Sequence, residues 1–138
     1  HGDVARALAE RFGPLKLYLG QDREATRRYR PFWTPTLFFL DPNGHALQDW
    51  GGTIPAEAFL PLLDLGEALV GLRRGRFKEA LNLLEGVVNQ HPESVFAPDA
   101  LWWLGAVQQV AKGDGEALTR TRQLILEKYP GSAAALRV

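Results

Sequence analysis

Hydrophobic residues follow a short-range strand pattern in the first part of this chain and a helical pattern in the second. The run Thr36–Leu40 is short, apolar and aromatic, and turn-forming residues bound it, so it predicts a buried strand. Proline cannot donate a ladder hydrogen bond, so this strand begins at or just after Pro35. Asp41–Gly44 (Asp-Pro-Asn-Gly) predicts a tight turn. His45–Trp50 then predicts a second strand, antiparallel to the first.

Three segments before this hairpin also carry regular patterns. Asp3–Phe12 predicts a helix, because apolar residues recur every four positions after an acidic N-cap. Leu15–Leu19 alternates between apolar and other residues and predicts a strand. Asp22 is expected to cap a second helix that ends at Tyr29.

From Asp64 onward the spacing of apolar residues is helical throughout. Amphipathic helices are predicted over Phe77–Gln90, Pro98–Ala111 and Glu116–Tyr129. Proline follows the first and third of these segments, as expected where a helix stops. Ser132 is expected to cap one more short helical turn.

The amino-acid composition excludes several classes of function. The formal net charge is zero, which argues against binding of nucleic acid or other polyanions. No apolar run reaches the roughly 18 residues of a membrane span. Cysteine is absent, which excludes a disulfide, a thiolate nucleophile and a cysteine-ligated metal within this chain. The histidines His1, His45 and His91 are scattered, so neither a metal site nor a cofactor is predicted.

The stretch Trp33–Gly44, with Gly51–Gly52 and the helix after it, resembles the C-terminal half of a thioredoxin-like domain. In that family a strand opens with X-Thr-Pro-Thr, and the proline peptide is cis and faces a Cys-x-x-Cys motif. The resemblance therefore implies a cis Thr34–Pro35 bond. It also implies an α/β thioredoxin-like fold over residues 1–63 that is incomplete at its N-terminus.

The strand that leads into Cys-x-x-Cys in this family lies between the strands that match Leu15–Leu19 and Thr36–Leu40, and this chain does not contain it. Without it, both strands would have unpaired backbone groups, which are costly when buried. Three outcomes are open: an upstream segment is missing from this chain, another chain donates a strand, or the first 20 residues pack differently. The first is favoured.

Residues 64–138 resemble an all-α tail of tetratricopeptide-like helical hairpins. Small, aromatic and proline residues occupy the positions expected in such a repeat, namely Ala68, Gly75, Phe77, Ala80, Leu84 and Pro92. A second, degenerate copy follows with Gly105, Gly113, Ala117 and Tyr129–Pro130. Small residues let paired helices approach, and the proline ends the second helix.

No catalytic residue is predicted. The thioredoxin-like resemblance implies that Thr34 offers its backbone to an extended substrate and that Trp33 lines the groove beside Pro35. The alternative, that Trp33 fills the core, stays open. Trp102 and Trp103 are adjacent on a predicted helix and cannot share a face, so an exposed one is a candidate contact for a protein partner.

Two functions are consistent with these patterns. One is thiol–disulfide exchange, with redox cysteines that this chain lacks, so that enzymatic activity is undecided. The other is a non-catalytic adaptor whose tetratricopeptide-like tail binds a protein partner. Either way the expected partner is a protein or peptide rather than nucleic acid. The compartment, bacterial cytoplasm or periplasm, is not determined by the sequence.

Overall fold

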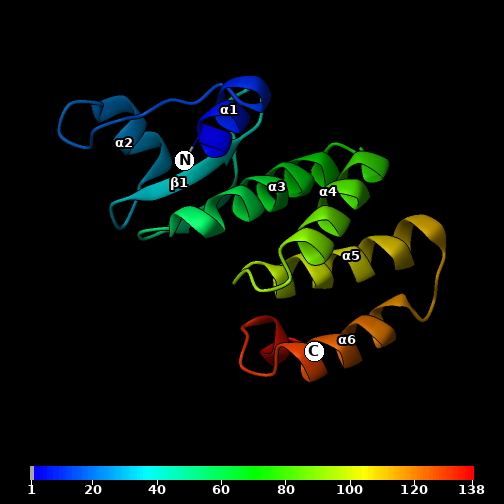
Figure 1. The fold of residues 1–138 in the computed structure, drawn as a ribbon. Helices are drawn as coiled ribbons and strands as arrows, with labels where there is room; N and C mark the ends of the chain where they lie inside the picture. The colour runs from blue at the N-terminus through cyan, green and yellow to red at the C-terminus, as the bar shows by residue number, and fades with distance from the viewer. Residues whose placement is uncertain (1) are drawn as a thin grey trace. The chain divides into compact units, whose positions relative to one another are not determined.

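The computed structural model describes residues 2–138, which divide into two compact units, one ending at Leu60 and one over Pro61–Val138 (Figure 1). Each unit is described by itself. The domain boundary at residues 63 and 64 remains a prediction. The regular elements of the described residues are α1 (Gly2–Arg11), α2 (Arg23–Tyr29), β1 (Thr36–Leu40), β2 (Ala46–Gly51), α3 (Ala56–Arg73), α4 (Phe77–Gln90), α5 (Ala97–Lys112), α6 (Ala117–Lys128) and the 3-10 turn η1 (Ala134–Leu136).

The first unit is built on an antiparallel hairpin of β1 and β2, as the hydrophobic pattern predicted. The register pairs Thr36 with Gly51 and Leu37 with Trp50. It shifts between Phe39 and Leu40, because β2 carries one extra residue there. The alternation of residues along β1 is therefore uninterrupted.

Aromatic side chains attach the first two helices to opposite faces of β1. The Phe39 ring lies 5.8 Å from the Phe12 ring, just after α1, and 5.5 Å from the Trp50 ring. The Phe38 ring lies 5.5 Å from the Tyr29 ring at the end of α2. Because successive residues of a strand point to opposite faces, α1 and α2 end on different sides of the hairpin.

The prediction of a strand over Leu15–Leu19 is wrong. Residues 12–18 have no regular structure, and the apolar side chains of the segment are exposed, with Leu15 78% exposed. The segment is tied to α2 instead: the Tyr18 N–H donates to the Asp22 carboxylate (2.6 Å), and the Thr26 hydroxyl donates to Leu19 O (3.1 Å). Alternation predicts a strand only where a neighbouring ladder is available, and no described strand pairs with this segment.

The second unit is helical, and the predicted helices are confirmed to within two residues at each end (Figure 1). α4 packs beside α5, and α5 packs beside α6. At Gly71 an added Cβ would lie 3.8 Å from the Ala80 Cβ, so α3 and α4 approach closely there. At Gly105 an added Cβ would lie 2.2 Å from the Thr121 hydroxyl oxygen, so only glycine fits between α5 and α6.

The chain turns the same corner after α4 and after α6. His91 (φ −131°, ψ 50°) and Tyr129 (φ −134°, ψ 50°) end these helices, and proline follows each. Ser94 N–H donates to His91 O (3.0 Å), and Ser132 N–H donates to Tyr129 O (3.0 Å). η1 stands where α5 begins after the first corner. The Ser132 hydroxyl accepts a hydrogen bond from Ala135 N–H (3.1 Å), as expected of a capping residue.

Candidate functional site: the Trp33 turn and the free edge of β1

The turn between α2 and β1 presents two aromatic side chains to solvent. Phe32 is 99% exposed and Trp33 is 66% exposed. The Thr36 hydroxyl donates to Trp33 O (2.6 Å), which fixes the backbone of the turn to the start of β1. The Thr34–Pro35 peptide bond is cis. Trp33 therefore does not fill the core, whereas its part in substrate binding stays a prediction.

The residues of β1 that bond β2 can be identified from the two ends of the hairpin. Gly52 N–H donates to Pro35 O (2.8 Å), and Asp41 N–H donates to His45 O (3.0 Å). In an antiparallel ladder every second residue directs its N–H and C=O groups to the same neighbour. The odd-numbered residues of this stretch therefore face β2.

The even-numbered residues Thr36, Phe38 and Leu40 direct their backbone N–H and C=O groups to the other edge of β1. Within residues 2–138 the sheet has two strands, and none of these groups has a hydrogen-bond partner. We call this row the free edge of β1. It contains neither proline nor a charged residue, the usual devices that discourage strand pairing. A third strand can therefore add here.

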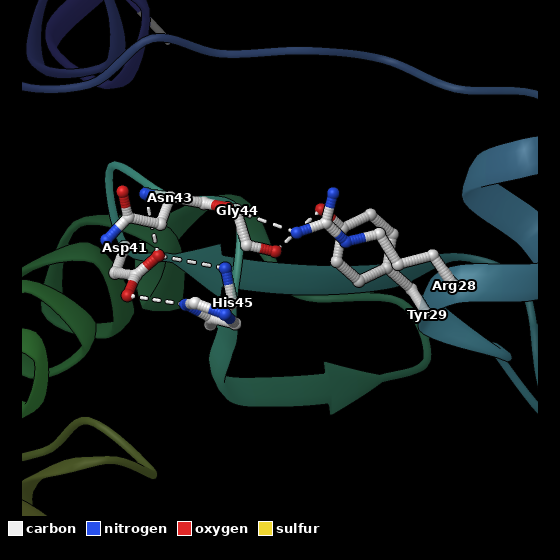
Figure 2. A network of polar contacts seen from close by, with 6 residues as sticks. All are labelled: Arg28, Tyr29, Asp41, Asn43, Gly44 and His45. Atoms are coloured by element: carbon white, nitrogen blue, oxygen red, sulfur yellow. Dashed lines mark hydrogen bonds and ion pairs between the residues drawn. The ribbon is translucent and has the colours of Figure 1, made fainter.

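The hairpin turn is held rigidly at the opposite end of β1 (Figure 2). The Asp41 carboxylate accepts hydrogen bonds from the backbone N–H groups of Asn43 (2.8 Å) and His45 (2.9 Å), and lies 3.0 Å from the His45 Nδ1. The hydrogen bond from the His45 backbone is the main cause that lowers the pKa of Asp41. The turn therefore contains an Asp that stays ionised at neutral pH.

Two side chains of α2 reach the same turn from outside (Figure 2). The Arg28 guanidinium donates to Asn43 O (3.1 Å), and the Tyr29 hydroxyl donates to Gly44 O (2.9 Å). Gly44 has φ +77°, a conformation that glycine adopts without strain. These bonds fix the hairpin turn relative to the end of α2.

The described residues contain no metal-binding cluster: within residues 2–138 no group of three or more His, Cys, Asp or Glu side chains is placed to hold an ion. In the same range no helix combines the length and apolar character required to cross a membrane. The Trp33 turn and the free edge of β1 present exposed aromatic rings and unpaired backbone groups.

Trp102 and Trp103 of α5 are both half-buried. Their adjacent positions led us to expect that one of them would be exposed, and neither is fully so. Trp102 packs against the core cluster of Leu101, Ile125 and Ala134. Trp103 lies about 100° further around the helix, two turns before Val110, which is 80% exposed. Trp103 is thus the better candidate for a partner contact, and this role stays a prediction.

The chain was compared with models of known protein families. A family model described as a thioredoxin-like domain matches residues 4–67. Residues 4–67 are a thioredoxin-like domain. The match includes the Trp33 turn, the hairpin and the start of α3, and a helical region follows it. No curated protein and no solved structure matches the chain.

The sequence identified part of this site. It indicated Trp33, Thr34 and Pro35 through the thioredoxin-like resemblance, but it missed Phe32. The signal was present, since Pro31 and Pro35 enclose two adjacent aromatic residues in a segment too short to bury both. The free edge of β1 was expected, whereas the residues that form it follow only from the hairpin register.

Proposed function

We propose that the thioredoxin-like domain binds an extended polypeptide along the free edge of β1, as the recognition part of a thiol–disulfide exchange protein. The observation that carries this proposal is the row of unpartnered backbone groups on Thr36, Phe38 and Leu40, next to an exposed Trp33. Strand addition obtains its affinity from such main-chain groups and its specificity from neighbouring side chains.

Each residue of the turn has a role in this proposal. Trp33 and Phe32 supply exposed aromatic area against which side chains of the bound polypeptide pack. Thr34 offers its backbone to the polypeptide, and Pro35 sets the direction in which the chain enters β1. In a full-length protein whose upstream strand leads into Cys-x-x-Cys, that strand would pair with the free edge of β1. The polypeptide would then bind at the turn, through the Thr34 backbone and the Trp33 ring.

The redox chemistry comes from outside this chain, because residues 1–138 contain no cysteine. A Cys-x-x-Cys thiolate attacks one sulfur of the substrate disulfide and releases the other as a thiolate. The second cysteine then attacks the mixed disulfide. The substrate is reduced to a dithiol, and the Cys-x-x-Cys pair is oxidised to a disulfide. The thioredoxin-like domain orients the substrate for the first attack.

Two measurements test this proposal. The reading frame before His1 is examined for a strand-like segment ending in Cys-x-x-Cys, and the full-length product is assayed for insulin reduction. Binding is tested separately with carboxymethylated insulin B chain, which is extended and has no free thiol. Hydrogen exchange should show protection of the Thr36, Phe38 and Leu40 amides when the peptide binds.

The Trp33→Ala variant should weaken binding of that peptide, whereas Phe77→Ala, an exposed aromatic of the helical unit, should leave it unchanged. Equal protection in all three proteins, or no protection at any peptide concentration, rules out recognition at this edge. A full-length, cysteine-containing protein that never reduces insulin removes the enzymatic reading and leaves the binding result to stand alone.

An adaptor function is the second candidate, and it is favoured by the half-buried Trp103 and the exposed Val110 on one side of α5. A Trp103→Ala/Val110→Ala protein should lose a protein partner while keeping insulin-chain binding. If the reading frame upstream of His1 contains no cysteine pair, this candidate becomes the stronger one.

A further inference from the structure

The turn between α3 and α4 concentrates positive charge. Residues 73–78 (Arg-Arg-Gly-Arg-Phe-Lys) contain four of the 16 lysine and arginine residues of the chain and no acidic residue. We call this segment the basic turn. The zero net charge of the chain is an average, and it conceals this local cluster. Every residue of the segment is exposed.

The backbone of the basic turn is tightly held. Gly75 has φ +73°, and the N–H of Arg76 donates to Gly71 O (2.8 Å). By contrast, the four charged side chains make no hydrogen bond and no ion pair within the described part of the chain. The charges are therefore displayed on a fixed turn and remain available to an external anion.

Helix electrostatics explains only half of the cluster. Arg73 is the last residue of α3 and Arg74 follows it, at the helix end where the dipole favours positive charge. Arg76 is the N-cap residue of α4 and Lys78 lies in its first turn, where the dipole disfavours positive charge. Local stability alone would favour acidic residues at those two positions.

Phe77 stands in the middle of this cluster and is 42% exposed. Basic residues interleaved with an exposed aromatic ring are the composition of segments that lie on anionic membranes: the cations meet lipid headgroups while the ring enters the headgroup boundary. A carboxylate-rich polypeptide would use the cations but would gain less from the ring. A nucleic acid would need a longer basic surface than one turn.

We propose that the basic turn docks the protein on an anionic lipid surface. Each basic residue near such a surface strengthens binding about fivefold at low ionic strength. The contact is peripheral, since the turn contributes headgroup contacts and one ring rather than a membrane-crossing helix. It does not depend on the proposed peptide binding at β1.

The test is co-sedimentation of the whole chain with phosphatidylcholine vesicles that contain or lack phosphatidylglycerol. Binding is expected only with phosphatidylglycerol, and it should fall as salt rises. Arg74→Gln/Arg76→Gln should weaken binding about 25-fold. The control Lys112→Gln/Arg122→Gln removes the same charge from exposed positions on α5 and α6 and should weaken it much less. Phe77→Ala should cause a loss that persists at high salt.

Three results would overturn the proposal. One is no binding to phosphatidylglycerol vesicles at low salt by wild-type protein that is folded by circular dichroism. Another is an equal loss in the control double variant, which would assign binding to overall charge. The third is binding of the basic turn to poly-glutamate without binding to vesicles, which would identify an acidic polypeptide as the partner.

Discussion

Replacing Gly105 with alanine should destabilise the helical unit, because α5 and α6 leave no space for a side chain there. The added Cβ would lie 2.2 Å from Thr121 Oγ1, 2.7 Å from Thr121 Cβ and 3.0 Å from Thr121 Cγ2. Rotation about χ1 of Thr121 can move the oxygen and the methyl group. It cannot move the Cβ, so the two helix backbones must separate.

The magnitude follows from two opposing effects. Forcing an extra carbon into a packed interface costs about 1 to 3 kcal/mol, and a clash with a backbone-anchored Cβ belongs to the upper part of that range. Alanine in a helix interior is about 1 kcal/mol more favourable than glycine. The net loss of unfolding free energy should therefore be about 1 to 2 kcal/mol.

Urea denaturation followed by circular dichroism measures this loss, with Gly86→Ala as the matched control. Gly86 lies inside α4, and an added Cβ there would meet nothing within 4 Å. The same chemical change should thus stabilise the protein by up to about 1 kcal/mol at Gly86. Adding Thr121→Gly to the Gly105→Ala protein removes the clash and should reveal a favourable coupling of about 2 kcal/mol.

Changes in stability of the same sign and similar size for Gly105→Ala and Gly86→Ala would refute this expectation. Such a result would mean that α5 and α6 can separate at Gly105 without an energetic cost. An additive double variant would also contradict it, because then Thr121 is not the group that the new methyl meets.

Three other variants test polar contacts. Tyr29→Phe deletes the hydrogen bond to Gly44 O and should lower the free energy of unfolding by about 1 kcal/mol in urea titrations; an unchanged midpoint contradicts this. The pKa of Asp41 is lowered in the folded state, so its contribution to the free energy of unfolding is present above the ordinary pKa near 3.8 and is lost as pH falls further. Asp41→Ala should therefore destabilise the protein more at pH 7 than at pH 2. A loss of stability that does not change with pH would refute this assignment. Burial raises the pKa of Tyr129, so its contribution to the free energy of unfolding is present below the ordinary pKa near 10 and is lost as pH rises through the folded-state pKa. Urea titrations at alkaline pH should show this loss of stability in the wild type and not in Tyr129→Phe.

Elements bounded by strong local signals could be predicted from the sequence. β1 begins after Pro35 and ends before Asp41–Pro42, and α4 ends before His91–Pro92, so proline and turn chemistry set these limits almost to the residue. The predicted strand at Leu15–Leu19 failed for the complementary reason. A strand depends on a ladder partner far away in the sequence, and alternation reports only how side chains would lie if that partner were present.

The candidate site divides in the same way. Trp33 could be recognised from the motif around it, but its exposure depends on how α1 and α2 end on the two faces of the hairpin. Which backbone groups of β1 stay unpaired depends on the register, which no local pattern gives. The cluster of basic residues in the basic turn can be recognised in the sequence. That Arg76 and Lys78 have no internal partners can be seen only from the positions of the acidic groups in the structure.

The matching corners after α4 and α6 also make the helical unit extendable by protein engineering. His91 and Tyr129 have nearly identical backbone angles, and both start the same proline-and-serine turn. A duplicate of residues 91–128 inserted after Lys128 would thus meet a compatible backbone at each join. Each inserted copy would add two helices, and the number of copies would set the length of the helical unit.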